Sequence, residues 1–98
     1  MLTKRYIKSK NIMKVTFYAP PSLDAEAVYL VGDFNNWNET ATPMELLKDG
    51  RFKVIIELEP EKEYHFRYLV NGDEWHNDPE ADRYDPNPFH GDNSVVTT

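Results

Sequence analysis

The chain has no cysteine among its 98 residues, so its fold cannot rest on disulfide bridges and it has no thiolate for metal or redox chemistry. It also lacks any apolar run near the ~20 residues that cross a bilayer, and its first residues lack the apolar stretch of a secretory signal. We therefore expect a cytoplasmic protein with no membrane partner. An apolar content of 40% is enough for one modest core and a single domain.

Positive charge is scarce over most of the sequence. Five of the 11 Lys and Arg residues fall in the first fourteen positions, and from Val15 onward six basic residues face all 17 acidic ones. This excess of negative charge opposes contact with phosphate backbones and argues against nucleic acid as a partner. We interpret residues 1–13 as a basic, solvated arm without an assigned function, and residues 14–98 as the domain.

A long helical stripe is also missing, whereas apolar residues recur at every second position in short runs, which is typical of strands. The expected strands cover residues 14–19, 27–33, 44–48, 51–59, 64–70 and 94–97, with a short return strand at Trp75. Asp49-Gly50 and Asn71-Gly72 are two-residue hairpin signals. Residues 77–92, rich in Asp, Asn, Pro and Gly, are expected to form a long surface loop with no regular element. About seven short strands with regular turn signals predict an all-β fold, an antiparallel β-sandwich.

Two tryptophans lie among polar residues and outside the alternating core pattern. Trp37 is in a polar loop that follows the second expected strand, and Trp75 follows the Asn71-Gly72 turn. An exposed indole can stack against the apolar C–H face of a pyranose, and two of them can follow a curved glucan. The sugar hydroxyls also need polar partners, for which Arg67, Asn36, Asn93 and Asp73 are chemically suitable. The alternative is that each tryptophan caps the core beneath a loop and that Arg67 is a solvated strand residue.

Catalytic and metal chemistry find little support in the sequence. Glycoside hydrolysis needs two carboxylates about 5–10 Å apart in a cleft, whereas the acidic residues here cluster in turns such as residues 78–82. His65, His76 and His90 are too widely spaced for a zinc site, and residues 73–92 do not match the ligand spacing of a calcium-binding hand. We therefore expect a protein that is not an enzyme and needs neither a metal nor a cofactor.

Three sequence blocks occur in a distinctive order: Val28–Trp37 (VYLVGDFNNW), Tyr64–Gly72 (YHFRYLVNG), and Trp75 followed by Asn77-Asp-Pro. In these blocks and their spacing, most of the chain resembles carbohydrate-binding module family 48. That family includes the glycogen-binding domain of the AMP-activated protein kinase β subunit and the N-terminal early-set domains of branching and debranching enzymes. The resemblance implies an immunoglobulin-like, early-set β-sandwich that binds glycogen, starch or maltooligosaccharides.

The resemblance also implies roles for individual residues. It implies that Trp37 and Trp75 stack on glucose rings, that Arg67 stands where the kinase domain has a sugar-binding lysine, and that Asn93 matches an asparagine that bonds sugar hydroxyls. Arginine keeps the charge of that lysine but changes the geometry of the donors. The turn before Trp75 also has one residue more than the kinase-type turn, at Asp73-Glu74.

Two further pairs fall in or near the matching blocks. Phe89 and His90 align loosely with a leucine that threads against the glucan in the kinase-type domain. Gly32 and Phe34 belong to the first block, but we interpret them as structural: Gly32 permits a bend and Phe34 plugs the core beneath the loop.

The sequence thus predicts non-catalytic binding of an α-1,4-linked glucan. An alternative function is protein interaction or regulation, in which the same face docks a partner or a separately encoded α-glucan enzyme of the glycoside hydrolase 13 type, because exposed aromatics serve protein contacts equally well. In a third reading, the matching blocks preserve only the fold.

Overall fold

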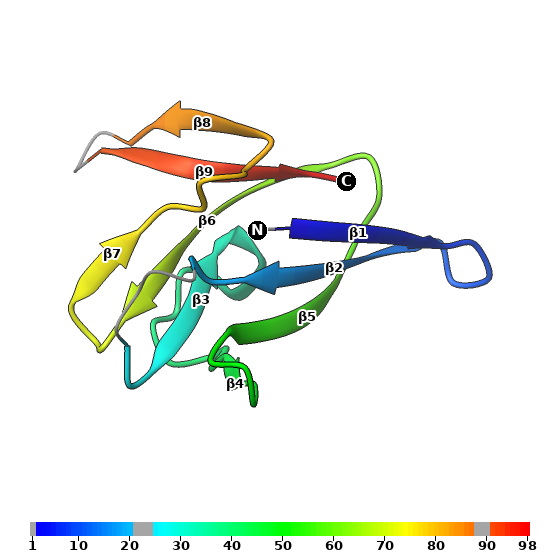
Figure 1. Cartoon of the computed structure of the whole chain (residues 1–98). Helices are drawn as coiled ribbons and strands as arrows, with labels where there is room; N and C mark the ends of the chain where they lie inside the picture. The colour runs from blue at the N-terminus through cyan, green and yellow to red at the C-terminus, as the bar shows by residue number, and fades with distance from the viewer. Residues whose placement is uncertain (1, 21–24, 88–90) are drawn as a thin grey trace.

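The computed structural model describes residues 2–20, 25–87 and 91–98. Over these residues the chain forms nine strands and one short 3-10 helix (Figure 1). The elements are β1 (Leu2–Ile7), β2 (Ile12–Tyr18), β3 (Val28–Gly32), η1 (Asp33–Asn35), β4 (Glu45–Leu46), β5 (Phe52–Leu58), β6 (Glu63–Val70), β7 (Glu74–His76), β8 (Arg83–Pro86) and β9 (Asp92–Thr97). No helix in this part of the chain is long and apolar enough to cross a membrane.

The strands form two antiparallel sheets that pack against each other. One sheet has the order β1-β2-β5-β4 and the other the order β3-β6-β9-β8. β7 pairs with the C-terminal half of β6, while β9 pairs with its N-terminal half on the same side. The predicted all-β antiparallel sandwich is thus confirmed, in keeping with an immunoglobulin-like early-set fold.

The core lies between the two sheets and follows the period-2 alternation of the sequence. Val15 and Phe17 on β2 face Phe66 and Tyr68 on β6, and all four are fully buried. The rings of Phe17 and Phe66 meet edge to face with centroids 5.1 Å apart, an arrangement that aromatic quadrupoles favour. Because the even-numbered residues of β6 fill the core, its odd-numbered residues must point to the outer face of that sheet.

The first residues differ from the sequence-based prediction. Residues 1–13 were expected to form a solvated arm, but Leu2–Ile7 form β1, which pairs with β2 along its whole length. The expected boundary at residue 13 therefore falls inside β2. Lys4 of β1 also donates to the Asp82 carboxylate at 2.6 Å, which ties this edge to the other sheet. The basic residues belong to a strand because backbone pairing does not require apolar side chains.

Residues 77–87 also contain a strand that was not predicted. This strand is β8, which pairs with β9 at the edge of the second sheet. Asp78, in a turn that we expected at the surface, is fully buried: its carboxylate accepts hydrogen bonds from the Tyr68 hydroxyl at 2.7 Å and from the Glu80 N–H at 2.8 Å. The pKa of Tyr68 lies well above its usual range. Burial is the larger cause, and the neighbouring Asp78 carboxylate adds to it. The expectation of an irregular surface loop was therefore wrong for Arg83–Pro86.

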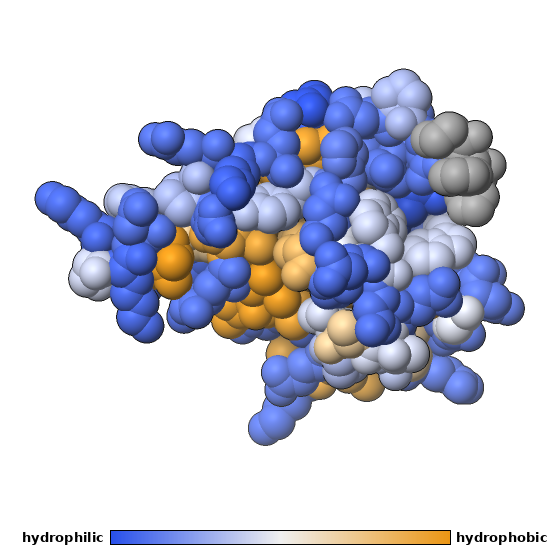
Figure 2. Space-filling view, turned by 180° about the vertical axis from the view of Figure 1, so that it is seen from behind, coloured by the Kyte–Doolittle hydropathy of each residue, from blue (hydrophilic) through white to orange (hydrophobic). Residues whose placement is uncertain are grey.

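Apolar side chains gather in one area on the back of the molecule (Figure 2). β5 carries three apolar residues that the described part of the chain covers incompletely. Val54 and Ile56 are half-buried, and Ile55 on the opposite face of the strand is 42% exposed. β4 pairs only with the first two residues of β5, so the rest of this strand edge has no further strand beside it among residues 2–20, 25–87 and 91–98.

Candidate functional site

Trp75 is placed by the tight turn between β6 and β7. Asn71 and Gly72 both have positive φ, 53° and 82°, as a hairpin turn that matches the strand twist requires. The return strand sets Trp75 directly opposite Leu69. Directly opposed residues point to the same face of a sheet, so the indole lies with Leu69 and Arg67 on the outer face of the β3-β6-β9-β8 sheet.

Trp37 comes from the loop that follows β3. Asn36 and Trp37 both have φ of 56°, a left-handed conformation that large side chains rarely adopt. The loop is held by Asn35, whose side chain accepts from the Gly32 N–H at 3.0 Å and donates to the Leu30 carbonyl at 2.9 Å. The backbone N–H of Trp37 in turn donates to the Gly32 carbonyl at 2.9 Å. Backbone strain at a candidate binding residue is typical of functional sites.

Phe34 anchors the same loop from below. Its ring centroid lies 5.7 Å from that of Phe17 and 6.2 Å from that of Tyr64, so it packs against the core. The structural role predicted for Phe34 agrees with this packing, whereas Gly32 has an extended backbone and is required for its close approach to β6 rather than for a bend.

Arg67 lies on the outer face of β6 but is only 6% exposed. Its Nε donates to the Asp92 carbonyl at 3.0 Å, and Nη2 contacts the same oxygen. Burial lowers the pKa of Arg67, and the nearby Asp92 carboxylate opposes that effect. An arginine still keeps its charge in a protein, so the site contains a fixed cation. The solvated Arg67 of the alternative reading does not match this burial.

The structure brings Trp37, Trp75 and Arg67 together. With Asn87 they line a hollow of about 90 Å³. Arg67 and Trp75 also line a larger hollow of about 370 Å³ together with His76, Asn77 and Gly91. Both indoles are half-buried, so neither is sunk in the core and each presents part of its surface to solvent. The paired tryptophans form a shared surface, which we call the tryptophan face.

The remaining predicted residues differ in whether they contribute to these hollows. Asn93 is half-buried, and its Oδ1 accepts from the Asn87 side chain at 3.1 Å, which links it to a residue that lines the smaller hollow. Asn36 and Asp73 are exposed and line neither hollow. Phe89 and His90 lie outside the described residues.

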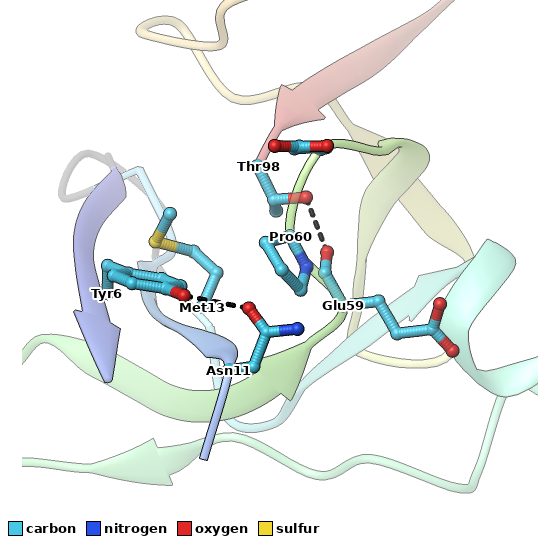
Figure 3. A pocket seen from close by; sticks show the side chains of 7 residues that line it. Tyr6, Asn11, Met13, Glu59, Pro60 and Thr98 are labelled. Carbon is cyan, nitrogen blue, oxygen red and sulfur yellow. Dashed lines mark hydrogen bonds between the residues drawn. The ribbon is translucent and has the colours of Figure 1, made fainter. Parts of the chain in front are cut away.

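A larger hollow of about 510 Å³ lies elsewhere (Figure 3), lined by Tyr6, Asn11, Met13, Glu59, Pro60, Glu61 and Thr98. It sits by the turns that join β1 to β2 and β5 to β6, on the other side of the molecule from the β6–β7 turn (Figure 1). The hydroxyl of Tyr6 donates to Asn11 at 2.7 Å. Its described lining has one aromatic ring and two carboxylates, so it does not offer a pair of stacking platforms.

Clusters of potential metal ligands are absent from the part of the chain that the structure describes. No group of three His, Asp or Glu side chains there is arranged to hold an ion.

Comparison with known proteins identifies the family to which the chain belongs. The family model described as carbohydrate-binding module 48, the isoamylase N-terminal domain, matches residues 4–87. The chain belongs to this family. The match begins inside β1, which agrees with the inclusion of that strand in the sandwich.

Two curated relatives of the module are branching enzymes. A 1,4-alpha-glucan branching enzyme GlgB of Aquifex aeolicus is 32% identical over 81 residues, which are 81% of this chain and 12% of the enzyme. A 1,4-alpha-glucan-branching enzyme of Dictyostelium discoideum is 53% identical over 32 residues, 33% of this chain and 5% of the enzyme. The module thus spans only a small part of each relative.

Sequence reasoning missed several residues around the tryptophan face. Asp33 accepts the indole N–H of Trp37, Asn87 lines the smaller hollow, and Asn77 donates to the same Asp92 carbonyl as Arg67. The position of Asp33 four residues before Trp37 is a local signal that could have been read. The roles of Asn77 and Asn87 depend on the path of β8, which the sequence pattern did not reveal.

Proposed function

We propose that this carbohydrate-binding module holds an α-1,4-linked glucan on the tryptophan face without changing it. The observation that carries the proposal is that Trp37 and Trp75, 38 positions apart in the sequence, line one hollow with Arg67. Two aromatic surfaces beside a cation and several amides match the chemistry of a sugar chain, which has apolar C–H faces and polar hydroxyls. The names of the relatives, which act on 1,4-alpha-glucan, support this choice of polymer.

The roles proposed for single residues follow their positions. Trp37 and Trp75 stack on successive glucose rings. Arg67 supplies hydrogen-bond donors from a fixed position, since the Asp92 carbonyl already holds its guanidinium. Asn93 contributes its amide beside Asn87, while Asn36 and Asp73 contribute at the exposed rim. The binding should be weak, with a dissociation constant in the micromolar to millimolar range, because hydroxyls exchange water for protein.

The test is a titration with maltoheptaose followed by tryptophan fluorescence and amide chemical shifts. Removal of one platform by Trp37→Ala or Trp75→Ala should weaken binding about tenfold, the equivalent of roughly 1.4 kcal/mol, and the double variant should not bind measurably. Tyr6→Ala is the matched control, because Tyr6 is 49% exposed and lies away from the tryptophan face. Each variant is first checked for a retained fold by circular dichroism.

Three results would contradict the proposal. A flat response of the native chain up to several millimolar maltoheptaose would reject glucan binding. Equal loss of affinity in Tyr6→Ala and in the tryptophan variants would reject the tryptophan face as the site. New reducing ends or branch points after long incubation with amylose would reject the non-catalytic role. Cellohexaose, with β-linked glucose, serves as the control ligand and should bind more weakly than maltoheptaose.

Docking to an α-glucan enzyme is the second candidate function. From the sequence it was expected on the face of the tryptophans, but the incompletely covered apolar residues of β5 favour a surface on the other sheet. A hollow of about 300 Å³ lined by Pro43, Glu45, Lys53, Val54 and Ile55 lies beside them. The small share of each branching enzyme that the module spans fits a surface that meets further protein. In size-exclusion chromatography with a purified branching enzyme, Ile55→Lys should abolish co-elution and leave maltoheptaose binding intact. Co-elution of Ile55→Lys equal to that of the native chain would remove this candidate.

The cytoplasmic location stays a prediction from the sequence.

A further inference from the structure

Polar side chains form a hydrogen-bonded path across the outer face of the β3-β6-β9-β8 sheet, and it begins at Trp37. The indole Nε1–H of Trp37 donates to Asp33 Oδ1 at 2.8 Å. The other carboxylate oxygen of Asp33 accepts the backbone N–H of His65 at 2.7 Å and lies 3.1 Å from His65 Nδ1. His65 Nε2 lies 2.9 Å from Asp85 Oδ2. His65 therefore joins the loop that carries Trp37 to the edge strand β8.

The path continues beyond His65 and ends on β6. Arg83 Nε donates to Asp85 Oδ1 at 3.0 Å, and Nη2 donates to Asp85 Oδ2 at 2.9 Å. The same guanidinium donates to Glu63, with Nη2 3.0 Å from Oε1. Arg83 thus holds Asp85 in place with two parallel bonds, a geometry that gives direction as well as attraction.

The orientation of the indole depends on this path because the ring N–H donates to Asp33, whereas the backbone N–H of Trp37 donates separately to the Gly32 carbonyl. Left-handed φ at both Asn36 and Trp37 costs about 1–3 kcal/mol per residue, which the surrounding contacts must offset. The Asp33 carboxylate is the group that receives the indole N–H, and it sits where both the backbone and the ring of His65 can donate to it.

The ring of His65 is poised between two carboxylates, and its protonation state decides how many it can serve. A neutral imidazole has one N–H donor, whereas the imidazolium has two. Only the imidazolium can donate to Asp33 and Asp85 at once, and in the neutral form one ring lone pair faces a carboxylate oxygen. The charged groups around the ring are Asp33 on η1, Asp85 and Arg83 on β8, and Glu63 and Arg67 on β6; its neighbour on β9, Val95, is uncharged.

Electrostatics agree with this geometry. Burial alone lowers the pKa of His65, but the hydrogen bonds to Asp85 and Asp33 outweigh it, so the pKa lies above the ordinary value of 6.5. Because the folded pKa is raised, the interaction of the protonated ring is complete below the ordinary value and is lost as the pH rises through the folded value.

We propose that His65 is a positioning residue of the glucan site, which through Asp33 fixes the Trp37 indole when its ring is protonated. This inference rests on the proposed function, because it assigns a control element to the same tryptophan face. Glucan binding then becomes pH-dependent through a residue that does not touch the sugar: affinity should be about three- to tenfold higher at pH 5.5 than at pH 8.5.

The direct test needs no sugar. In ¹H–¹⁵N spectra of the full chain, the Nε1–H signal of Trp37 should shift between pH 5 and 9 with the midpoint of the His65 ring. The Trp75 Nε1–H signal is the internal control and should not follow that midpoint. His65→Gln should remove the Trp37 transition, and Asp85→Asn should move it to lower pH, because it removes one of the two carboxylates that favour the imidazolium. A Trp37 signal that stays flat, or that titrates unchanged in His65→Gln, would overturn the proposal.

The second test measures maltoheptaose affinity at pH 5.5 and 8.5. The native chain should lose affinity at the higher pH, and His65→Gln should bind equally at both. Equal affinity of the native chain at both pH values overturns the positioning role while the proposed function stands. Absence of binding at both pH values overturns the proposed function and the control of glucan affinity with it, and the indole signal still decides whether His65 orients Trp37.

Discussion

Replacement of Gly32 by alanine tests whether the close contact between β3 and β6 controls both the fold and the tryptophan face. A Cβ added at this position would lie 2.5 Å from the His65 carbonyl oxygen, 2.9 Å from Phe66 Cβ and 2.9 Å from Phe34 Cζ. The first two atoms belong to the paired strand β6 and cannot rotate away. The ring of Phe34 is held against Phe17. The backbone must therefore move.

The expected loss of stability in Gly32→Ala follows from the cost of forcing an extra carbon into a packed site. Such overpacking costs about 1–3 kcal/mol, and a clash with backbone on the neighbouring strand places Gly32→Ala at the upper end, near 3 kcal/mol. For a domain of this size, 1 kcal/mol lowers the melting temperature by about 4–8 °C, so a fall of roughly 12–24 °C is expected. Glucan affinity should fall as well, because the Gly32 carbonyl accepts the Trp37 N–H.

Gly50→Ala is the matched control, since Gly50 has φ of 91° and, apart from its chain neighbours, no described atom lies within 4 Å of an added Cβ. Only the left-handed backbone opposes alanine there, at about 1 kcal/mol, or roughly 4–8 °C. Thermal melts followed by circular dichroism and maltoheptaose titrations compare the two variants. If Gly32→Ala melts no lower than Gly50→Ala, or keeps native glucan affinity, the close-contact argument is wrong.

Two other perturbations probe the carboxylates around the second sheet. Asp78→Ala should lower the free energy of unfolding in urea by about 2–4 kcal/mol because it leaves the buried Tyr68 hydroxyl without this acceptor, and Tyr68→Phe made in the Asp78→Ala background should cost little more; fully additive losses would refute the pairing. Hydrogen bonds from Arg83, and then from His65, lower the pKa of Asp85 from 3.8 to about 2, so its contribution to stability is present above the ordinary value and is lost as the pH falls through about 2. The melting temperature should therefore fall more steeply over this range in the native chain than in Asp85→Asn, and parallel curves would contradict the assignment.

The elements that could be predicted from the sequence are those whose side chains alternate against the core. On β6, Phe66, Tyr68 and Val70 are buried as the period-2 pattern requires, and the Asn71-Gly72 turn stands where the hairpin signal placed it. The two tryptophans and Arg67 could be selected because large residues outside that pattern need another explanation. The hairpin sets Trp75 beside Arg67, and the loop that follows β3 brings Trp37 to the same hollow.

The strands that escaped prediction, β1 and β8, both lie at sheet edges. Four of the six side chains of β1 are exposed, and β8 has a single half-buried residue, Asp85, so neither shows an apolar alternation. Edge strands are held by backbone hydrogen bonds along one side, which side-chain patterns do not report. The path from Asp33 through His65 to Asp85 could not be predicted for the same reason, since it depends on β8 lying beside β9.

The outer face of the β3-β6-β9-β8 sheet explains why the two readings of the tryptophans, as core caps and as binding platforms, are compatible. Leu69 points to this outer face and yet is only 2% exposed, and its cross-strand neighbours are Tyr29 and Trp75. One side of the indole can shield Leu69 from water while the rest of the ring, which is half-buried overall, remains open to a ligand. Under the proposed function, a platform that also covers an apolar residue loses less conformational entropy when it binds a sugar.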